Sequence, residues 1–202
     1  GTYPIDVEKM GIDMLAFPGH KGLLGPQGTG GLYIHPNIDL KPLLYGGNGS
    51  QSEAIGQPTV RPDRYESGTQ NTVGIAGLNA GVKLILQTTP EAIHKKEWLL
   101  TQTLMEGLMN LSDVEILGPY IGLDRSGIVS FNLKNKDASE VAFILDRSYG
   151  IAVRAGFHCS PLAHETAGTI DRGAVRASIG YYTTHEDVEY LLKALKEIKK
   201  NT

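Results

Sequence analysis

Glycine is unevenly distributed along this chain of 202 residues, and this distribution constrains the fold more than any other feature. Residues 19–81 are rich in glycine, whereas the stretch 82–117 contains only Gly107. Glycine permits positive φ and close approach of the backbone, and it weakens helices. The sequence therefore predicts a first unit of loops and short strands and a second unit of longer elements, with the boundary between residues 70 and 90.

The second unit combines helical and strand patterns. Thr89 and Pro90 form a favourable helix start, because proline is well tolerated at the first helical position. An apolar stripe at near-helical spacing follows them. Alternating helices and strands indicate an α/β layer structure. The predicted strands cover 31–35, 127–133, 151–154 and 174–179, and the predicted helices cover 90–108, 137–150 and the segment after Thr184.

The composition excludes several classes of protein. Hydrophobic residues make up 41% and charged residues 20% of the chain, which is typical of a globular protein and not of a disordered or membrane-spanning one. A net charge of −3 provides no basic stripe, so nucleic acid is not an expected partner. A single cysteine excludes a disulfide framework and fits a reducing, cytoplasmic environment. Because the chain begins at Gly1 and not at Met, we expect the natural start to be missing.

The glycine-rich segment 17–31 surrounds one lysine, Lys21. A phosphate-binding P-loop is excluded because Gly22, and not Ser or Thr, follows Lys21. The glycine intervals also differ from the dinucleotide-binding fingerprint. Two interpretations remain open. Either Lys21 is a solvated residue on a surface turn, or a tight apolar pocket lowers the pKa of its amine and makes it a nucleophile toward an aldehyde.

The only cysteine, Cys159, directly follows His158 and lies five residues after Arg154. A neighbouring cation favours the reactive thiolate, although lone cysteines are more often buried and inert. The surrounding Gly, Ser and Pro residues indicate a loop after a strand, where reactive groups often lie. No metal site is expected, because His158, Cys159 and His164 do not complete a zinc shell.

Two further polar segments leave alternatives open. Arg176 lies in a predicted strand, where it is either an ion-pair partner or a fork for a carboxylate. Thr69 lies in a polar turn, 64–71, before a Gly/Ala-rich helix. Thr69 and the helix N-terminus either bind an anion such as phosphate or serve only as a cap.

Together these segments resemble the cysteine desulfurase and selenocysteine lyase branch of the class V aminotransferases, which are pyridoxal-phosphate-dependent enzymes of fold type I. The resemblance implies that this α/β chain is the C-terminal half of such an enzyme. Residues 1–75 would end the large cofactor-binding domain, 76–89 would form a connecting helix or linker, and 90–202 would form the small C-terminal domain. The matching strings cover 12–21, 25–30, 64–71, 154–159 and 175–178.

The resemblance also implies roles for residues around the cofactor. Lys21 would form a Schiff base with pyridoxal phosphate and later move protons. His20 would lie beside the cofactor phosphate. Thr69 matches a residue that reaches the phosphate of the neighbouring subunit, so the resemblance implies a homodimer with shared active sites.

A second group of implied roles concerns the substrate. Arg176 would clamp the substrate carboxylate, and Arg154 would help to orient the substrate. Cys159 would accept the sulfur of cysteine as a persulfide, which releases alanine. His158 would act as a proton donor or as an orienting residue.

The resemblance therefore implies a cytoplasmic cysteine desulfurase that converts L-cysteine to L-alanine and passes the sulfur to an acceptor protein. The alternatives are a selenocysteine lyase, a class V aminotransferase of small amino acids, and a non-catalytic assembly or partner-binding domain. In the family, the preceding half supplies the acid at the pyridine nitrogen, the aromatic group stacked on the ring and most phosphate donors. We therefore expect this chain to be inactive on its own.

Overall fold

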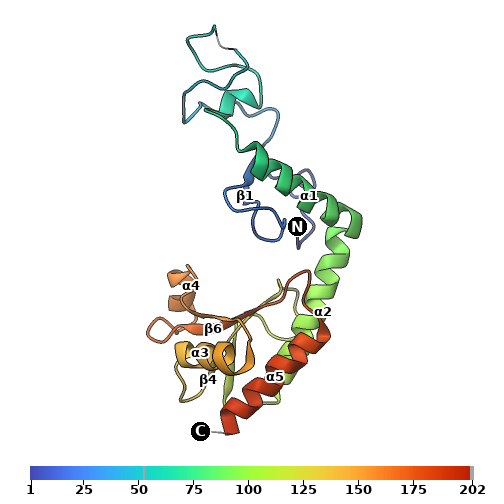
Figure 1. Cartoon of the computed structure of the whole chain (residues 1–202), viewed down its shortest axis with the longest axis vertical. Coiled ribbons are helices and arrows are strands. Elements are labelled where there is room, and N and C mark those ends of the chain that lie inside the picture. The colour runs from blue at the N-terminus through green and yellow to red at the C-terminus, as the bar shows by residue number, and fades with distance from the viewer. Residues whose placement is uncertain (52, 201–202) are drawn as a thin grey trace. The chain divides into compact units, whose positions relative to one another are not determined.

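The computed structural model describes residues 1–51 and 53–200. The chain divides into two compact units, the first covering Tyr3–Pro90 and the second beginning at Glu91 (Figure 1). Both units combine helices with antiparallel strands, which confirms the predicted α/β class. The assignment of the first unit to a cofactor-binding domain stays a prediction.

The first unit contains a two-stranded sheet and one long helix. Strand β1 (Met14–Pro18) pairs antiparallel with β2 (Gly30–Ile34), and the short 3-10 helix η1 covers Asp63–Tyr65. Helix α1 (Thr72–Thr88) begins where the helical pattern starts in the sequence. Asn71 caps α1, because its side chain accepts a hydrogen bond from the backbone N–H of Gly74 at 3.0 Å.

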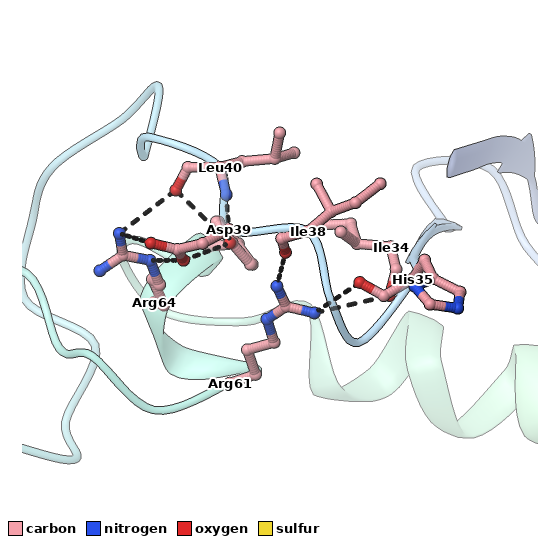
Figure 2. A network of polar contacts seen from close by, with 8 residues as sticks. Ile34, His35, Ile38, Asp39, Leu40, Arg61 and Arg64 are labelled. Carbon is pink, nitrogen blue, oxygen red and sulfur yellow. Dashed lines mark hydrogen bonds and ion pairs between the residues drawn. The ribbon is translucent and has the colours of Figure 1, made fainter. Parts of the chain in front are cut away.

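Polar side chains organise the irregular segment between β2 and α1 (Figure 2). The guanidinium groups of Arg61 and Arg64 donate to backbone carbonyls of residues 34–40, and Arg64 also pairs with Asp39 at 3.0 Å. These bonds satisfy backbone oxygens in a segment that has little regular secondary structure. The carbonyl acceptors are those of Ile34, His35 and Ile38 for Arg61 and that of Leu40 for Arg64.

The second unit is built on a four-stranded antiparallel sheet with the order β3-β4-β6-β5. Three long helices contribute buried apolar side chains to one core with this sheet, and a short fourth helix follows β5. The strands are β3 (Val114–Leu117), β4 (Ile128–Leu133), β5 (Arg154–Gly156) and β6 (Ala174–Ser178). The helices are α2 (Pro90–Met109), α3 (Ala138–Tyr149), α4 (Pro161–Thr166) and α5 (His185–Lys200).

Side-chain alternation gives the central strands two different faces. Val129 and Phe131 of β4, with Val175 of β6, are fully buried in the core shared with α2, α3 and α5. Their neighbours Ser130 and Arg176 therefore point to the opposite face. Burial of apolar area stabilises the face of the sheet that packs on the helices, and the other face carries polar side chains such as these two.

Most predicted elements are confirmed, but the strand predicted over 151–154 is wrong in its bounds. Strand β5 covers Arg154–Gly156, because the N–H of Ile151 still bonds to the carbonyl of Leu145 at the end of α3, at 3.0 Å. The sequence did not predict β1, β3 or α4, of which β3 has four residues and α4 six. None of the helices in the described residues is long and apolar enough to cross a membrane.

Candidate active site

Lys21 lies in a tight turn that follows β1. The N–H of Gly19 donates to the carbonyl of Thr29 at 2.7 Å, and the N–H of Gly25 donates to the carbonyl of Gly19 at 2.8 Å. Gly19 is buried, and a Cβ atom there would lie 2.3 Å from Oγ1 of Thr29. Glycine is therefore required at position 19, and the backbone on both sides of Lys21 is fixed.

Helix α1 supports the same turn through glycines on one of its faces. An added Cβ at Gly77 would lie 2.7 Å from Cγ of Pro26, and one at Gly81 would lie 2.4 Å from the carbonyl oxygen of Leu23. Residues four apart lie on the same helix face. The segment after Lys21 thus packs directly on the backbone of α1, which holds the turn in one position.

The structure places His20, Lys21 and Thr69 in the first unit, and all three side chains are exposed. The described residues of this unit thus do not form the tight apolar pocket that one interpretation predicts around Lys21. The interpretation of Thr69 as a helix cap is also wrong, because Asn71 caps α1. An exposed amine on a fixed turn is accessible to a reactive carbonyl compound.

Arg154 and Arg176 lie side by side in the second unit. Strand pairing places Arg154 of β5 directly opposite Arg176 of β6, and Ser130 of β4 on the other side of Arg176. The Nε atom of Arg176 is buried and has no hydrogen-bond partner in the part of the chain that the structure describes. Buried polar groups are normally satisfied, so this guanidinium fits a ligand with a carboxylate better than it fits an internal ion pair.

The loop after β5 brings Cys159 back to Arg154. An Nη2 hydrogen of Arg154 is donated to Sγ of Cys159 at 3.1 Å, and the cysteine side chain is exposed. His158 and Cys159 have φ values of 54° and 60°, in the left-handed region that non-glycine residues rarely adopt. Such a conformation costs about 1–2 kcal/mol per residue, and it is concentrated at functional sites.

The contact between Arg154 and Cys159 makes a testable prediction. Replacing Arg154 by Met is expected to slow alkylation of Cys159 by iodoacetamide about tenfold at pH 7, because a neighbouring cation favours the thiolate. The single cysteine makes the reaction specific, and Arg147→Met in α3 is the matched control. An unchanged rate in the Arg154 variant would show that the guanidinium does not activate this sulfur.

His158 lies within the same group of residues. Its Nε2 is 3.0 Å from the carbonyl oxygen of Arg154. Burial lowers the pKa of His158 below its usual value, the carbonyl of Arg154 opposes this effect, and the positive charges of Arg176 and Arg154 add to it. The imidazole is therefore mainly neutral at pH 7.

Two buried residues near His158 were missed as parts of the site. Nε2 of His164 in α4 lies 3.3 Å from Nδ1 of His158, whereas the sequence analysis considered His164 only as a member of an incomplete zinc shell. Thr169 bonds to His164 and is not marked by any sequence motif. Among the residues that the structure describes, no group of three or more His, Cys, Asp or Glu residues could hold a metal ion.

Comparison with known proteins identifies the family of the chain. Residues 1–191 match the family described as Aminotransferase class-V. This chain belongs to that family. Its class V relatives include a probable cysteine desulfurase of Methanothermobacter thermautotrophicus, which is 38% identical over 98% of the chain and 50% of the relative.

Solved structures match the chain as well. The apo structure of a cysteine desulfurase from Thermococcus onnurineus NA1 has a TM-score of 0.92 and 36% identity, over 100% of this chain and 50% of the other. A C-DES variant with glycine covalently linked to its PLP cofactor has a TM-score of 0.75 and 26% identity, over 96% of this chain and 48% of the other. The chain thus spans about half the length of the relatives it matches, and the predicted resemblance is confirmed.

Proposed function

We propose that this chain carries the sulfur-transfer residues of a pyridoxal-phosphate-dependent cysteine desulfurase. The observation that carries the proposal is the contact of 3.1 Å between Arg154 and Sγ of Cys159, beside Arg176, whose Nε has no hydrogen-bond partner among the described residues. A cysteine substrate has one carboxylate for an arginine fork and one sulfur for a thiolate. The names of the relatives support the same activity.

The residues of the first unit fit the cofactor of this family. Lys21 offers a primary amine on a fixed turn, and the exposed side chains of His20 and Thr69 offer groups that can bind a phosphate. When bound, pyridoxal phosphate supplies an electron sink for the negative charge that develops at the substrate Cα. In our proposal Lys21 holds the cofactor covalently and later carries the proton at Cα.

Cys159 carries out the sulfur transfer in this proposal. Its thiolate attacks the sulfur of the bound cysteine, so that an S–S bond forms while the Cβ–S bond breaks. The electron pair of the broken bond goes to Cβ, which takes up a proton and becomes the methyl group of alanine. Sulfur is oxidised to the persulfide level and Cβ is reduced, so no further oxidant or reductant is needed. Arg154 stabilises the thiolate before the attack.

Arg176 is proposed to bind the substrate carboxylate, and its replacement tests the proposed function. In a cofactor-loaded enzyme of the relatives' full length, Arg176→Lys is expected to lower kcat/KM for cysteine about 10- to 100-fold, mainly through KM, because the bidentate fork is lost. Arg172→Lys, which affects a surface pair with Glu115, is the matched control. An unchanged KM for cysteine would contradict the assignment.

The same assay separates the alternative reactions. Alanine and sulfide formed from cysteine support a desulfurase, whereas a keto acid formed from alanine would indicate an aminotransferase in which Cys159 has no role. A preference for selenocysteine would indicate a lyase. Absence of all three reactions in the cofactor-loaded enzyme would favour a non-catalytic assembly domain.

The partners follow from the same proposal. Thr69 is exposed in the polar turn before α1, and we propose that it reaches the cofactor phosphate of a second subunit in a homodimer. The proposed acceptor of the persulfide sulfur on Cys159 is a protein with its own nucleophilic thiol. The single cysteine supports a reducing, cytoplasmic environment.

A further inference from the structure

A chain of hydrogen bonds connects the buried part of the second unit to the Cys159 loop. Oγ1 of Thr169 is 2.8 Å from Nδ1 of His164, and Nε2 of His164 is 3.3 Å from Nδ1 of His158. Nε2 of His158 is in turn 3.0 Å from the carbonyl oxygen of Arg154. Thr169 and His164 are 0% and 6% exposed, so solvent has little access to these two members of the hydrogen-bond chain.

The carbonyl group at the end of this hydrogen-bond chain determines which atom donates in each bond. The carbonyl of Arg154 can only accept, so Nε2 of His158 carries a hydrogen and donates it. In a neutral imidazole the other nitrogen is then an acceptor, so Nδ1 of His158 accepts from Nε2 of His164. The same reasoning leaves Nδ1 of His164 as the acceptor for the hydroxyl of Thr169. The hydroxyl of Thr169 also lies 3.4 Å from the backbone carbonyl of His164, and the shorter contact of 2.8 Å assigns its hydrogen to Nδ1 of His164.

We infer that Thr169 and His164 are positioning residues, which hold His158 as the neutral Nε2–H tautomer and thereby hold the loop that carries Cys159. This inference deepens the proposed function and rests on it for the role of Cys159. Both ring nitrogens of His158 are occupied, so the arrangement favours an orienting role for His158 over the role of proton donor.

The loop needs such support because its backbone is strained. His158 and Cys159 are both in the left-handed region, which non-glycine residues leave when nothing holds them. The turn that contains Thr169 is itself anchored, because the N–H of Gly173 donates to the carbonyl of Thr169 at 2.8 Å and Asn132 of β4 donates to the carbonyl of Gly173 at 3.1 Å. Strand β4 thus stabilises the turn in which the hydrogen-bond chain begins.

The backbone also approaches closely at this point. An added Cβ at Gly173 would lie 2.9 Å from Cα of Gly156, the residue that ends β5 and begins the Cys159 loop. The Thr169 turn and the Cys159 loop therefore pack against each other without side chains between them. Any shift of Thr169 would be transmitted to the loop.

The charges around His158 agree with a neutral ring. The groups that act on it are Arg154 of β5, Arg176 of β6 and His164 of α4, and the positive charges of the two arginines oppose an imidazolium. Burial adds to this effect and lowers the pKa of His158. A neutral ring can keep one donor and one acceptor, as the direction of the chain requires.

The inference is tested by NMR on the full chain with ¹⁵N-labelled histidine, combined with iodoacetamide alkylation of Cys159. We expect His158 to be protonated at Nε2 and unprotonated at Nδ1. His164→Leu removes the donor to Nδ1, so the preference for this tautomer should weaken, because only the carbonyl of Arg154 still favours it. The pKa of His158 should rise, because Nδ1 becomes free to take a proton. Alkylation at pH 7 should slow about threefold to tenfold, because the sulfur loses its fixed place beside Arg154.

Conservative variants separate positioning from general loss of structure. His164→Gln retains an N–H near the position of Nε2 and should restore the His158 tautomer and the alkylation rate. Thr169→Val removes only the hydroxyl and should weaken the tautomer preference, whereas Thr169→Ser should not. Thr166→Val in α4, whose hydroxyl bonds only locally to the carbonyl of Leu162, is the control for loss of a threonine.

Three results would overturn the inference: a His158 protonated at Nδ1 in the wild type, a Leu variant that titrates and alkylates like the wild type, or Gln and Leu variants that behave alike. None of these measurements requires turnover of cysteine. The predicted tautomer, together with no desulfurase activity in the cofactor-loaded enzyme of the relatives' full length, would thus refute the proposed function and leave the positioning role intact.

Discussion

Replacing Cys159 by Ser in the cofactor-loaded enzyme is expected to reduce sulfide release from cysteine at least about a thousandfold. A serine hydroxyl is almost entirely protonated at neutral pH, so it cannot attack the substrate sulfur as the thiolate does. The left-handed backbone at position 159 is no less favourable for Ser than for Cys, so the loop should keep its conformation. Sulfide release in the presence of a reductant measures the effect, and the absorbance of the bound cofactor shows that the site is intact.

Ser160→Ala is the matched control for this substitution. Ser160 precedes the described helix α4, but its side chain forms no capping hydrogen bond to that helix. We expect the Ser160 variant to retain wild-type activity. Undiminished sulfide release by the Cys159 variant would mean that another group accepts the sulfur.

Replacing Lys21 by Ala is expected to abolish turnover to a similar extent, and it should also remove covalent retention of the cofactor. Lys21 is the only lysine in the turn that follows β1, and backbone bonds at Gly19 and Gly25 prevent another part of the turn from taking its place. The neighbouring His20 cannot replace a primary amine in bonding to an aldehyde. Mass spectrometry after borohydride reduction measures the retained cofactor.

Lys83→Ala provides the control for loss of a lysine in the first unit, because Lys83 is an exposed residue of α1 outside the turn. This variant should retain both cofactor and activity. Full covalent retention of the cofactor in the Lys21 variant would show that another lysine binds it.

The sequence was sufficient to predict the long elements of the fold. Helices α2, α3 and α5 carry apolar stripes over three or more turns, and α2 begins at the proline that marks its start. The short elements β1, β3 and α4 were missed, because four to six residues carry too little periodicity and depend on tertiary contacts. The bounds of β5 depend on its pairing with β6, which no local pattern specifies.

For the candidate site, the sequence predicted individual residues but not their arrangement in space. Motifs in the sequence indicated Cys159, Arg154 and Arg176, but they could not show that strand pairing places the two arginines opposite each other. The connection from Thr169 through His164 to His158 was not predictable either, because it depends on the left-handed backbone of His158 and Cys159 and on tertiary hydrogen bonds. The roles of these residues stay predictions that the experiments above address.

The most direct test of the account is to find the transferred sulfur itself. The cofactor-loaded enzyme is incubated with cysteine in the absence of reductant, treated with an alkylating reagent and digested, and its peptides are weighed by mass spectrometry. The account predicts that the peptide containing Cys159 gains the mass of one sulfur atom, together with one alanine released for each sulfur bound. Release of alanine and sulfide while the Cys159 peptide never carries additional sulfur would contradict it.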